Sequence, residues 1–191
     1  AWSALLAARA TRRPFVTTYH GAYAEPGAVK RLYNSVMARS DVVIANSRYT
    51  AELIRSRYGT EPARIRVIHC GVDAARFDPA AVAPGRVAAL RRQWGIAERE
   101  QVVLQAARLT SWKGQSVLIA AAARLARIRR LGDAVIVLAG DAQGREDYAD
   151  GLRRQARDLG IADRVRLVGH VDDVPAAFLA AHVAVVASTE P

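Results

Sequence analysis

The sequence alternates between short runs of aliphatic, β-branched residues and longer stretches with helical periodicity, which restricts the folds open to it. Several short runs are apolar almost throughout, as expected of strands covered on both faces of a parallel sheet. The alternation predicts an α/β fold with doubly wound parallel sheets. The expected strands are 15–19, 41–45, 65–69, 101–106, 134–139, 164–168 and 182–187, and the expected helices include 29–39, 47–57, 115–130, 146–159 and 174–181.

Local signals mark where these helices begin and end. Ser47 and Asp173 stand where an N-cap would accept a hydrogen bond from the first helical turn. Gly59, Gly132 and Gly160 stand where a helix would stop, because glycine readily takes the left-handed conformation of a C-terminal cap.

One stretch interrupts the alternation. "CGVDAARFDPAAVAPGRV" (70–87) contains two prolines and two glycines and has no strong period. We therefore predict that residues 1–72 form the end of a first domain and that 73–99 form a linker with the helix leading onward. Residues 100–191 would then form a second domain.

Composition excludes several classes of protein. No run approaches the roughly 18 apolar residues of a membrane span. The net charge is +10, but the basic residues are scattered, so the charge is poor evidence for nucleic-acid binding. The single cysteine, Cys70, cannot form an intrachain disulfide and is typical of a reducing compartment. We expect a cytoplasmic protein that can also contact the inner face of the membrane. We expect no metal site.

Polar residues and glycines follow nearly every expected strand. His20 follows the first strand, and Asn46 and Cys70 follow the next two. The second half repeats the arrangement with Arg108, Gly140, Gly169 and the stretch from Ser188 to Glu190. Open α/β sheets bind ligands at the carboxyl ends of their strands, so we expect a ligand cleft bordered by these ends.

The stretch "RLTSWKG" (108–114) carries the strongest chemical signal. Only two of the 28 basic residues are lysines, and one of them, Lys113, lies five residues after Arg108. Placed at the N-terminus of a helix, an arginine fork and a lysine form a site suited to a diphosphate. Two fixed cations can stabilise such a leaving group without a metal, and no Asp-x-Asp pair occurs in the chain. A solvated surface pair is the alternative interpretation of Arg108 and Lys113.

Weaker signals surround this loop. Gly140 would let a ligand approach the backbone closely, and Val171 could lie near a nucleoside base. Taken alone, however, Gly140 is more typical of an ordinary tight turn and Asp173 of a surface or capping residue, and a lone histidine such as His20 is more often structural than catalytic. Glu190, taken alone, is an ordinary surface carboxylate.

Taken together, seven stretches resemble the group 1 nucleotide-sugar glycosyltransferases. They follow that family's order and cover almost all of the chain: "VTTYHG", "DVVIANSRYTAELI", "IRVIHCGVD", "AARLTSWKGQSVLIAAAARL", "VLAGD", "VRLVGHVDDV" and "AVVASTEP". The resemblance implies a GT-B fold with two Rossmann-like domains, both incomplete in this chain.

The resemblance also implies roles for individual residues. Arg108 and Lys113 would bind the donor diphosphate and stabilise the leaving group, and His20 would contact the transferred sugar. Glu190 would be the first of two glutamates that hold the donor. The expected catalytic residues are His20, Arg108, Lys113 and Glu190, and the expected donor-binding residues are Gly114, Gly140, Val171 and Asp173.

Departures from the family pattern predict a fragment. Three features of the family have no counterparts within 1–191. They are the second glutamate of the family motif, the family's own first strand with its glycine-containing loop, and the closing helix. We expect the 191-residue chain by itself to bind donor weakly and to transfer little sugar.

The resemblance predicts a retaining, metal-independent transferase. It would move a sugar from a UDP- or GDP-linked donor to a hydroxyl of an acceptor glycan or lipid-linked sugar, in cell-envelope polysaccharide or glycolipid synthesis, with no cofactor. One alternative is a non-catalytic basic module that binds nucleic acid or an acidic membrane. Another is a sugar-nucleotide epimerase of the same architecture.

Overall fold

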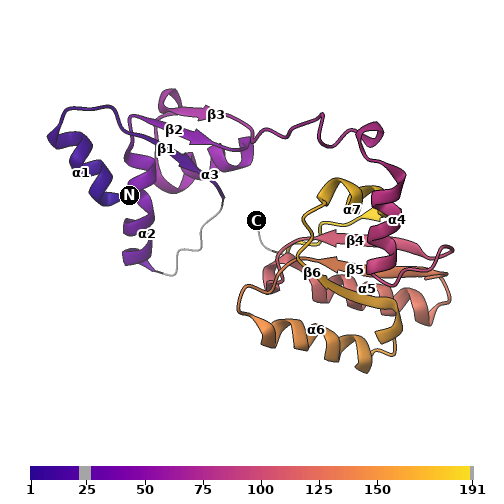
Figure 1. Cartoon of the computed structure of the whole chain (residues 1–191). Helices are drawn as coiled ribbons and strands as arrows, with labels where there is room; N and C mark the ends of the chain where they lie inside the picture. Colours follow the sequence, from indigo (N-terminus) through magenta and orange to yellow (C-terminus); the bar gives the residue numbers. More distant parts are fainter. Residues whose placement is uncertain (22–26, 190–191) are drawn as a thin grey trace. The chain divides into compact units, whose positions relative to one another are not determined.

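A computed structural model describes residues 1–21 and 27–189, which divide into two compact units (Figure 1). The first unit is Ala1–Val72, and the second begins at Asp73. How these units correspond to the domains of a complete protein stays a prediction. Among the described residues, no helix combines the length and the apolar composition that a membrane span needs.

The first unit is built on a parallel sheet with strand order β1-β2-β3. Buried side chains of Tyr19, Val43, Ala45 and Ile54 form its core. The strands are β1 (Val16–Tyr19), β2 (Val42–Ala45) and β3 (Ile65–Val67), and the α-helices are α1 (Trp2–Ala10), α2 (Ala28–Asn34) and α3 (Arg48–Tyr58).

The helix expected over 29–39 is shorter and changes type. After α2 the chain continues as a 3₁₀ helix, Ser35–Arg39. The Ser35 hydroxyl donates to the Leu32 carbonyl oxygen over 2.7 Å, and such local bonds compete with the regular α-helical pattern. Helix α1 is not among the helices expected from the sequence.

The second unit is a parallel sheet with strand order β6-β5-β4-β7 (Figure 1). The strands are β4 (Gln101–Ala106), β5 (Ala134–Ala139), β6 (Val165–Gly169) and β7 (Val183–Ala184). The α-helices are α4 (Pro84–Gln93), α5 (Gln115–Arg127), α6 (Glu146–Asp158) and α7 (Val174–Ala180). The α/β class with parallel sheets is therefore confirmed.

The burial of strand β5 explains why its sequence is apolar throughout. All six residues are buried, and the last five alternate between two core clusters. Val135 and Val137 share one cluster with residues of α4 and α7, whereas Ile136 and Leu138 share the other with residues of α5 and α6. The strand has no solvent-facing side on which a polar side chain would be tolerated.

Residues 73–99 belong to the second unit. Helix α4 begins with Pro84, whose missing N–H costs nothing at the start of a helix. Leu90, Trp94 and Ile96 are buried in the core cluster beside α7. The Arg86 guanidinium also forms an ion pair with Asp173, at 2.6 Å, which connects the start of α4 to the start of α7.

Most of the expected caps are confirmed. The Ser47 hydroxyl accepts the Thr50 N–H over 3.0 Å, and Asp173 accepts the Ala176 N–H over 3.2 Å. Gly59 ends α3 with a left-handed φ of 63°. Gly132 does not end α5, because that helix stops at Arg127.

The last expected strand, 182–187, is only two residues long. Val183 and Ala184 pair with Val103 and Leu104, and one further bond joins the Val185 N–H to the Leu104 carbonyl. The chain then leaves the sheet, and the Thr189 N–H donates to the Trp112 carbonyl oxygen over 2.9 Å. Contact with the loop after β4 therefore replaces further strand pairing.

Replacing Ile136 by alanine should destabilise the second unit by about 2–5 kcal/mol, because the side chain is 2% exposed and its removal leaves a cavity. Urea denaturation followed by circular dichroism would measure the loss. Val117→Ala, at a 50% exposed position of α5, should change the free energy of unfolding by less than about 0.5 kcal/mol. Equal effects of the two substitutions would contradict the buried position of β5.

Candidate active site

The loop between β4 and α5 carries both candidate cations. The chain leaves β4 at Ala106, forms a 3₁₀ turn, Ser111–Lys113, and enters α5 after Gly114. Arg108 is exposed, and Lys113 is partly buried with its ammonium 4.0 Å from the centre of the Trp112 ring. This cation–π contact limits the positions open to the lysine while leaving its N–H donors available.

Gly114 permits a close approach that no other residue would allow. Its φ is 73°, in the left-handed region, and a Cβ at this position would collide with the carbonyl oxygen of Ala187. The segment that follows β7 therefore lies directly against the start of α5. Glu190, the next residue after Thr189, lies outside the described residues.

Two buried glutamines hold the backbone of this loop. The Gln105 side-chain amide donates to the Lys113 carbonyl oxygen over 2.6 Å, and the Gln115 amide donates to the Arg108 carbonyl oxygen over 2.9 Å. The two glutamines are 2% and 0% exposed. The main-chain carbonyls of Lys113 and Arg108 are thus held by glutamine side chains, from β4 and α5 respectively.

Tyr148 extends this network to α6. Its hydroxyl donates to Oε1 of Gln115 over 3.1 Å. Burial raises the pKa of Tyr148 above its usual value, so the phenol remains a donor at neutral pH. Among the buried side-chain atoms that the structure describes, Gln105 Oε1 and Thr110 Oγ1 have no hydrogen-bond partner. Both belong to this region, and unpaired buried polar atoms are uncommon enough to mark it as specialised.

Main-chain hydrogen bonds join the carboxyl ends of three strands. The Leu109 N–H donates to the Asp141 carbonyl oxygen over 3.0 Å, and the Gly140 N–H donates to the Gly169 carbonyl oxygen over 2.8 Å. Gly140 also approaches Ala107 so closely that a Cβ would collide with the Ala107 carbonyl. These contacts place the ends of β4, β5 and β6 at one edge, as expected.

A hollow of about 440 Å³ opens at this edge. Its lining includes Arg108, Gly140, His170, Val171 and Phe178. The structure therefore brings together Arg108, Gly140 and Val171, three residues that the sequence analysis assigned to a ligand. A hollow of this size can accommodate a small organic molecule.

Lys113 and Gly114 lie on the loop described above, and the two remaining described candidates are Asp173 and His20. The carboxylate of Asp173 caps α7 and forms two hydrogen bonds with Arg86, at 2.6 and 2.8 Å, and the Arg86 guanidinium lowers the pKa of Asp173. These contacts match the alternative of a capping residue. His20 is exposed at the end of β1 in the first unit, where its carbonyl oxygen accepts the Asn46 amide over 2.7 Å.

Gln105, Gln115 and Tyr148 are not among the site residues expected from the sequence. Gln105 does carry a signal, because it is a polar residue within an apolar strand. A buried amide in a strand requires a partner, and a neighbouring loop is one place to find it. Among the described residues, no group of three or more His, Cys, Asp or Glu side chains could hold a metal ion.

Two family models match the chain. The model of glycosyl transferases group 1 matches residues 87–190, and the model of glycosyltransferase family 4 matches residues 1–76. Among similar proteins is the D-inositol 3-phosphate glycosyltransferase of Salinispora arenicola, 38% identical over 80% of this chain and 36% of that protein. The enzyme of the same description from Mycobacteroides abscessus is 35% identical over 68% of this chain and 27% of that protein.

Solved structures are similar over nearly the whole chain. A glycosyltransferase from Rickettsia africae has a TM-score of 0.85 and 27% identity, over 100% of this chain and 49% of that one. Anabaena HepE in complex with UDP and glucose has a TM-score of 0.83 and 29% identity, over 97% of this chain and 49% of that one. The chain thus spans about a third of the similar Salinispora enzyme and about half of these solved chains.

Gly114→Ala should lower the free energy of unfolding by about 1–3 kcal/mol more than Gly144→Ala. Both glycines have a positive φ, 73° and 79°, but only at Gly114 would the added methyl group meet a backbone carbonyl. Thermal and urea denaturation of both variants would measure the difference. Equal losses would show that the segment after β7 does not lie against this loop.

Proposed function

The chain belongs to the group 1 glycosyltransferases, and from this membership we propose that the complete protein transfers a sugar from a nucleotide-diphosphate donor to an acceptor hydroxyl. The observation that carries the proposal is the β4–α5 loop, which presents Arg108 and Lys113 at the start of a helix. HepE, one of the similar solved proteins, is described in complexes with UDP and with UDP-glucose, which supports a UDP-linked donor. A GDP-linked donor is the alternative.

In this proposal the diphosphate lies against the loop. The first N–H groups of α5 have no partners within the helix, and the helix dipole places partial positive charge there. Arg108 and Lys113 would add two full charges, and Gly114 would let the phosphates approach the backbone. The nucleoside would extend into the hollow along Gly140 and Val171, both at the same edge of the sheet.

Charge stabilisation is the chemistry that these residues offer. As the bond between the sugar and the diphosphate breaks, negative charge grows on the leaving oxygen. Cations that are already in place stabilise that charge without reorganising. We propose that Arg108 and Lys113 do this without a metal ion and that the sugar's configuration is retained, with His20 and Glu190 acting on the transferred sugar. Asp173 would act indirectly, by capping α7 beside the hollow.

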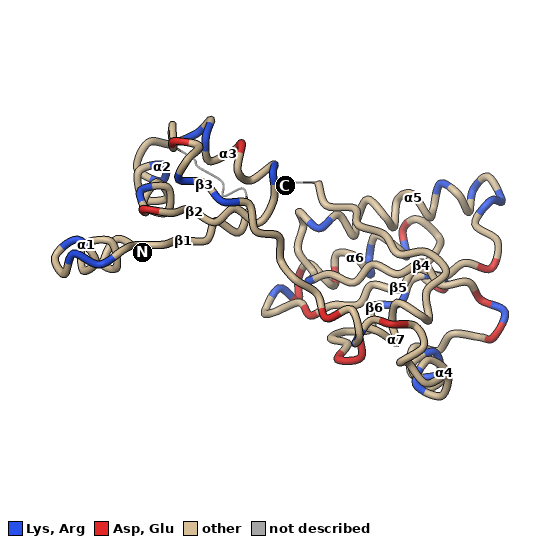
Figure 2. The backbone as a smooth tube through the Cα atoms, turned by 90° about the horizontal axis from the view of Figure 1, so that it is seen from above, with Lys and Arg blue, Asp and Glu red and all other residues tan. Residues whose placement is uncertain are grey.

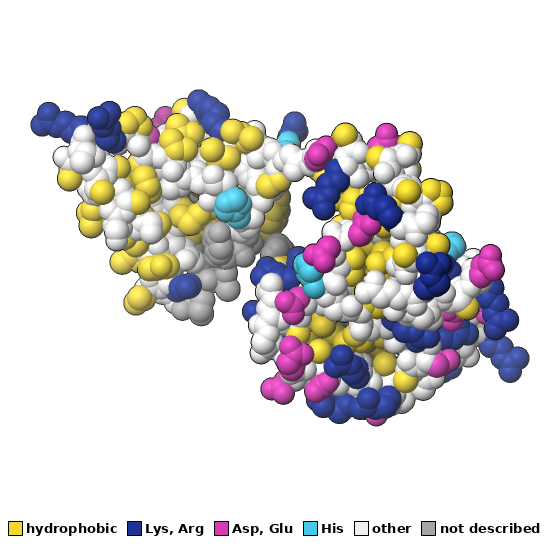
Figure 3. Space-filling view, viewed as in Figure 1, with side chains coloured by type: hydrophobic (Ala, Val, Ile, Leu, Met, Phe, Trp, Pro, Cys, Tyr) yellow, Lys and Arg dark blue, Asp and Glu magenta, His cyan; other side chains and the backbone are white. Residues whose placement is uncertain are grey.

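For the acceptor we propose a hydroxyl of a cell-envelope glycan or glycolipid, reached from the cytoplasm or from the inner face of the membrane. Because the chain belongs to this family, we prefer a transferase to the two other interpretations of the sequence, an epimerase and a non-catalytic basic module. Figure 2 shows Lys and Arg spread in short, separate stretches over the chain, and Figure 3 shows acidic and basic side chains intermingled over the second unit. Neither distribution favours a nucleic-acid surface.

Calorimetric titration of the chain with UDP, GDP and ADP tests the proposed donor site. We expect one nucleotide to bind at a single site and Lys113→Ala to weaken it at least tenfold, about 1.4 kcal/mol, because a direct charge on the diphosphate is lost. Lys30→Ala is the matched control, since Lys30 is the chain's other lysine and its ammonium lies 5.2 Å from the centre of the Tyr33 ring in the first unit. Equal loss in both variants would contradict a site at this loop.

Gln105→Leu should weaken the same nucleotide about three- to tenfold while the chain stays folded. Leucine keeps the side chain's approximate size but removes the amide that holds the Lys113 carbonyl. Amide hydrogen exchange at Lys113 and Gly114 should become faster, which a general loss of stability would not confine to this loop. Gln101→Leu, at the exposed start of the same strand, should alter neither quantity. Unchanged affinity in Gln105→Leu would remove the glutamine from the proposal.

A further inference from the structure

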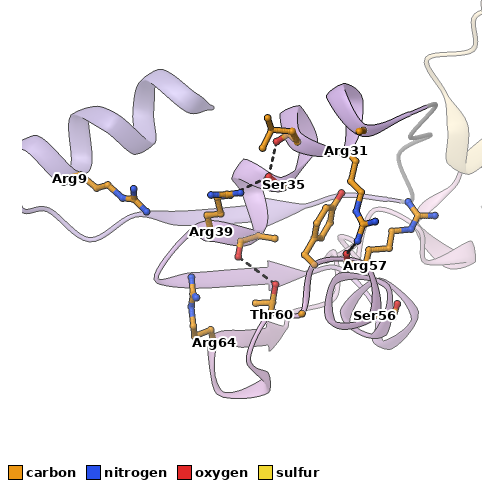
Figure 4. Close-up of a pocket in the computed structure, with 13 residues that line it drawn as sticks. Arg9, Arg31, Ser35, Arg39, Ser56, Arg57, Thr60 and Arg64 are labelled. Atoms are coloured by element: carbon orange, nitrogen blue, oxygen red, sulfur yellow. Dashed lines mark hydrogen bonds between the residues drawn. The ribbon is translucent and has the colours of Figure 1, made fainter.

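The first unit contains a cavity of about 750 Å³ whose lining is rich in arginine. Five of its described lining residues are arginines, and they come from α1, α2, the 3₁₀ helix Ser35–Arg39, α3 and a second 3₁₀ helix, Pro62–Arg64 (Figure 4). They are Arg9, Arg31, Arg39, Arg57 and Arg64. Residues that are up to 55 positions apart in the sequence thus present the same charge to one space.

Among the described residues that line this cavity, none carries a carboxylate. Within residues 1–21 and 27–189, Arg9, Arg31, Arg39 and Arg64 form no ion pair. Like charges gathered around one space repel each other, and an anion in that space would turn the repulsion into attraction.

Neutral contacts hold several of these guanidinium groups in place. The Arg39 Nε donates to the Ser35 hydroxyl over 3.2 Å, and its guanidinium carbon lies 5.4 Å from the centre of the Trp2 ring. The Arg31 Nη2 donates to the Arg57 carbonyl oxygen over 2.7 Å, and Arg64 donates to the Ser40 carbonyl. A guanidinium has five N–H donors, so each of these arginines keeps donors for a ligand. Side chains positioned in advance lose less entropy when they bind.

The position of the cavity separates it from the proposed transfer chemistry. Arg39 precedes β2, and Gly59, Thr60 and Arg64 precede β3, so the cavity lies at the amino ends of these strands. His20 and Asn46 follow β1 and β2 at the opposite, carboxyl edge. Because the strands are parallel, a ligand in the cavity would be a strand's length from His20.

We propose that this cavity binds a phosphate monoester, either free in solution or as the headgroup of a phospholipid. A phosphate monoester carries nearly two negative charges and three strong acceptor oxygens, so it can pair with several guanidinium forks at once. A single carboxylate would satisfy only one such fork. The volume leaves room for the body that carries the phosphate.

A chance gathering of surface arginines is the competing explanation, because the chain has 26 arginines among its 28 basic residues. Hollows in the second unit show what such chance gives. One has Arg124 and Arg127 in its lining, and another has Arg129 and Arg164 together with Asp163. Among its described lining residues, the cavity of the first unit has more than twice as many arginines and no acidic residue.

Nuclear magnetic resonance on the whole chain tests the proposal, with inorganic phosphate as the probe at 0.15 M salt. The chain would carry Arg108→Ala and Lys113→Ala, so that the proposed donor site does not contribute. We expect the backbone amides of Gly59 and Thr60 to shift and to saturate together. Adding Arg31→Gln and Arg39→Gln should weaken binding at least tenfold. Adding Arg13→Gln and Arg48→Gln instead removes the same charge from exposed positions outside the cavity and should change affinity less than twofold.

The source of the phosphate is tested by flotation with phosphatidylcholine vesicles, with and without phosphatidic acid. Recovery that needs both phosphatidic acid and the Arg31–Arg39 pair supports a lipid headgroup. Saturable shifts by inorganic phosphate without such recovery support a soluble phosphate monoester. The absence of both, in the chain with its cavity arginines intact, would overturn the proposal. Equal losses in the two arginine double variants would also overturn it, because screened general attraction would then explain the binding.

Discussion

The second unit depends on the complete burial of strand β5. A strand with no exposed residue needs a strand on each side and helices over both faces, and β4, β6 and the helices α4 to α7 supply them. Because helices cover both faces of the sheet, ligands can reach it at the ends of its strands. The loops at the carboxyl edge therefore become the natural place for a ligand, and the candidate cations lie there.

Close packing at that edge depends on small residues and on amides rather than on large side chains. Gly114 and Gly140 each lie where a Cβ would meet a backbone carbonyl, so they bring main chain against main chain. Gln105 and Gln115 then hold the β4–α5 loop by hydrogen bonds to two of its carbonyl groups. Rigid support matters because a misplaced cation stabilises developing charge less well.

Much of the fold could be predicted from the sequence because its determinants are local. Apolar runs located the strands, and Ser47 and Asp173 located two helix starts, since each of these signals acts within a few residues. Three features depended on distant contacts and were missed. Strand β7 is shortened where the chain turns to contact Trp112, and Gln105 meets Lys113 across a loop. The arginine-rich cavity gathers residues from Arg9 to Arg64, which no periodicity relates.

The hydrogen bonds that join the strand ends run between main-chain groups: Leu109 to Asp141, Gly140 to Gly169 and Thr189 to Trp112. These bonds involve no side-chain atoms, although the close approach of the chains requires glycine at position 140. Exposed side chains that line the hollow, such as His170 and Phe178, can therefore be exchanged while these bonds remain. The architecture thus separates two evolutionary tasks. The scaffold that positions the cations can remain constant while the lining drifts, so that one framework can give rise to hollows that accept different ligands.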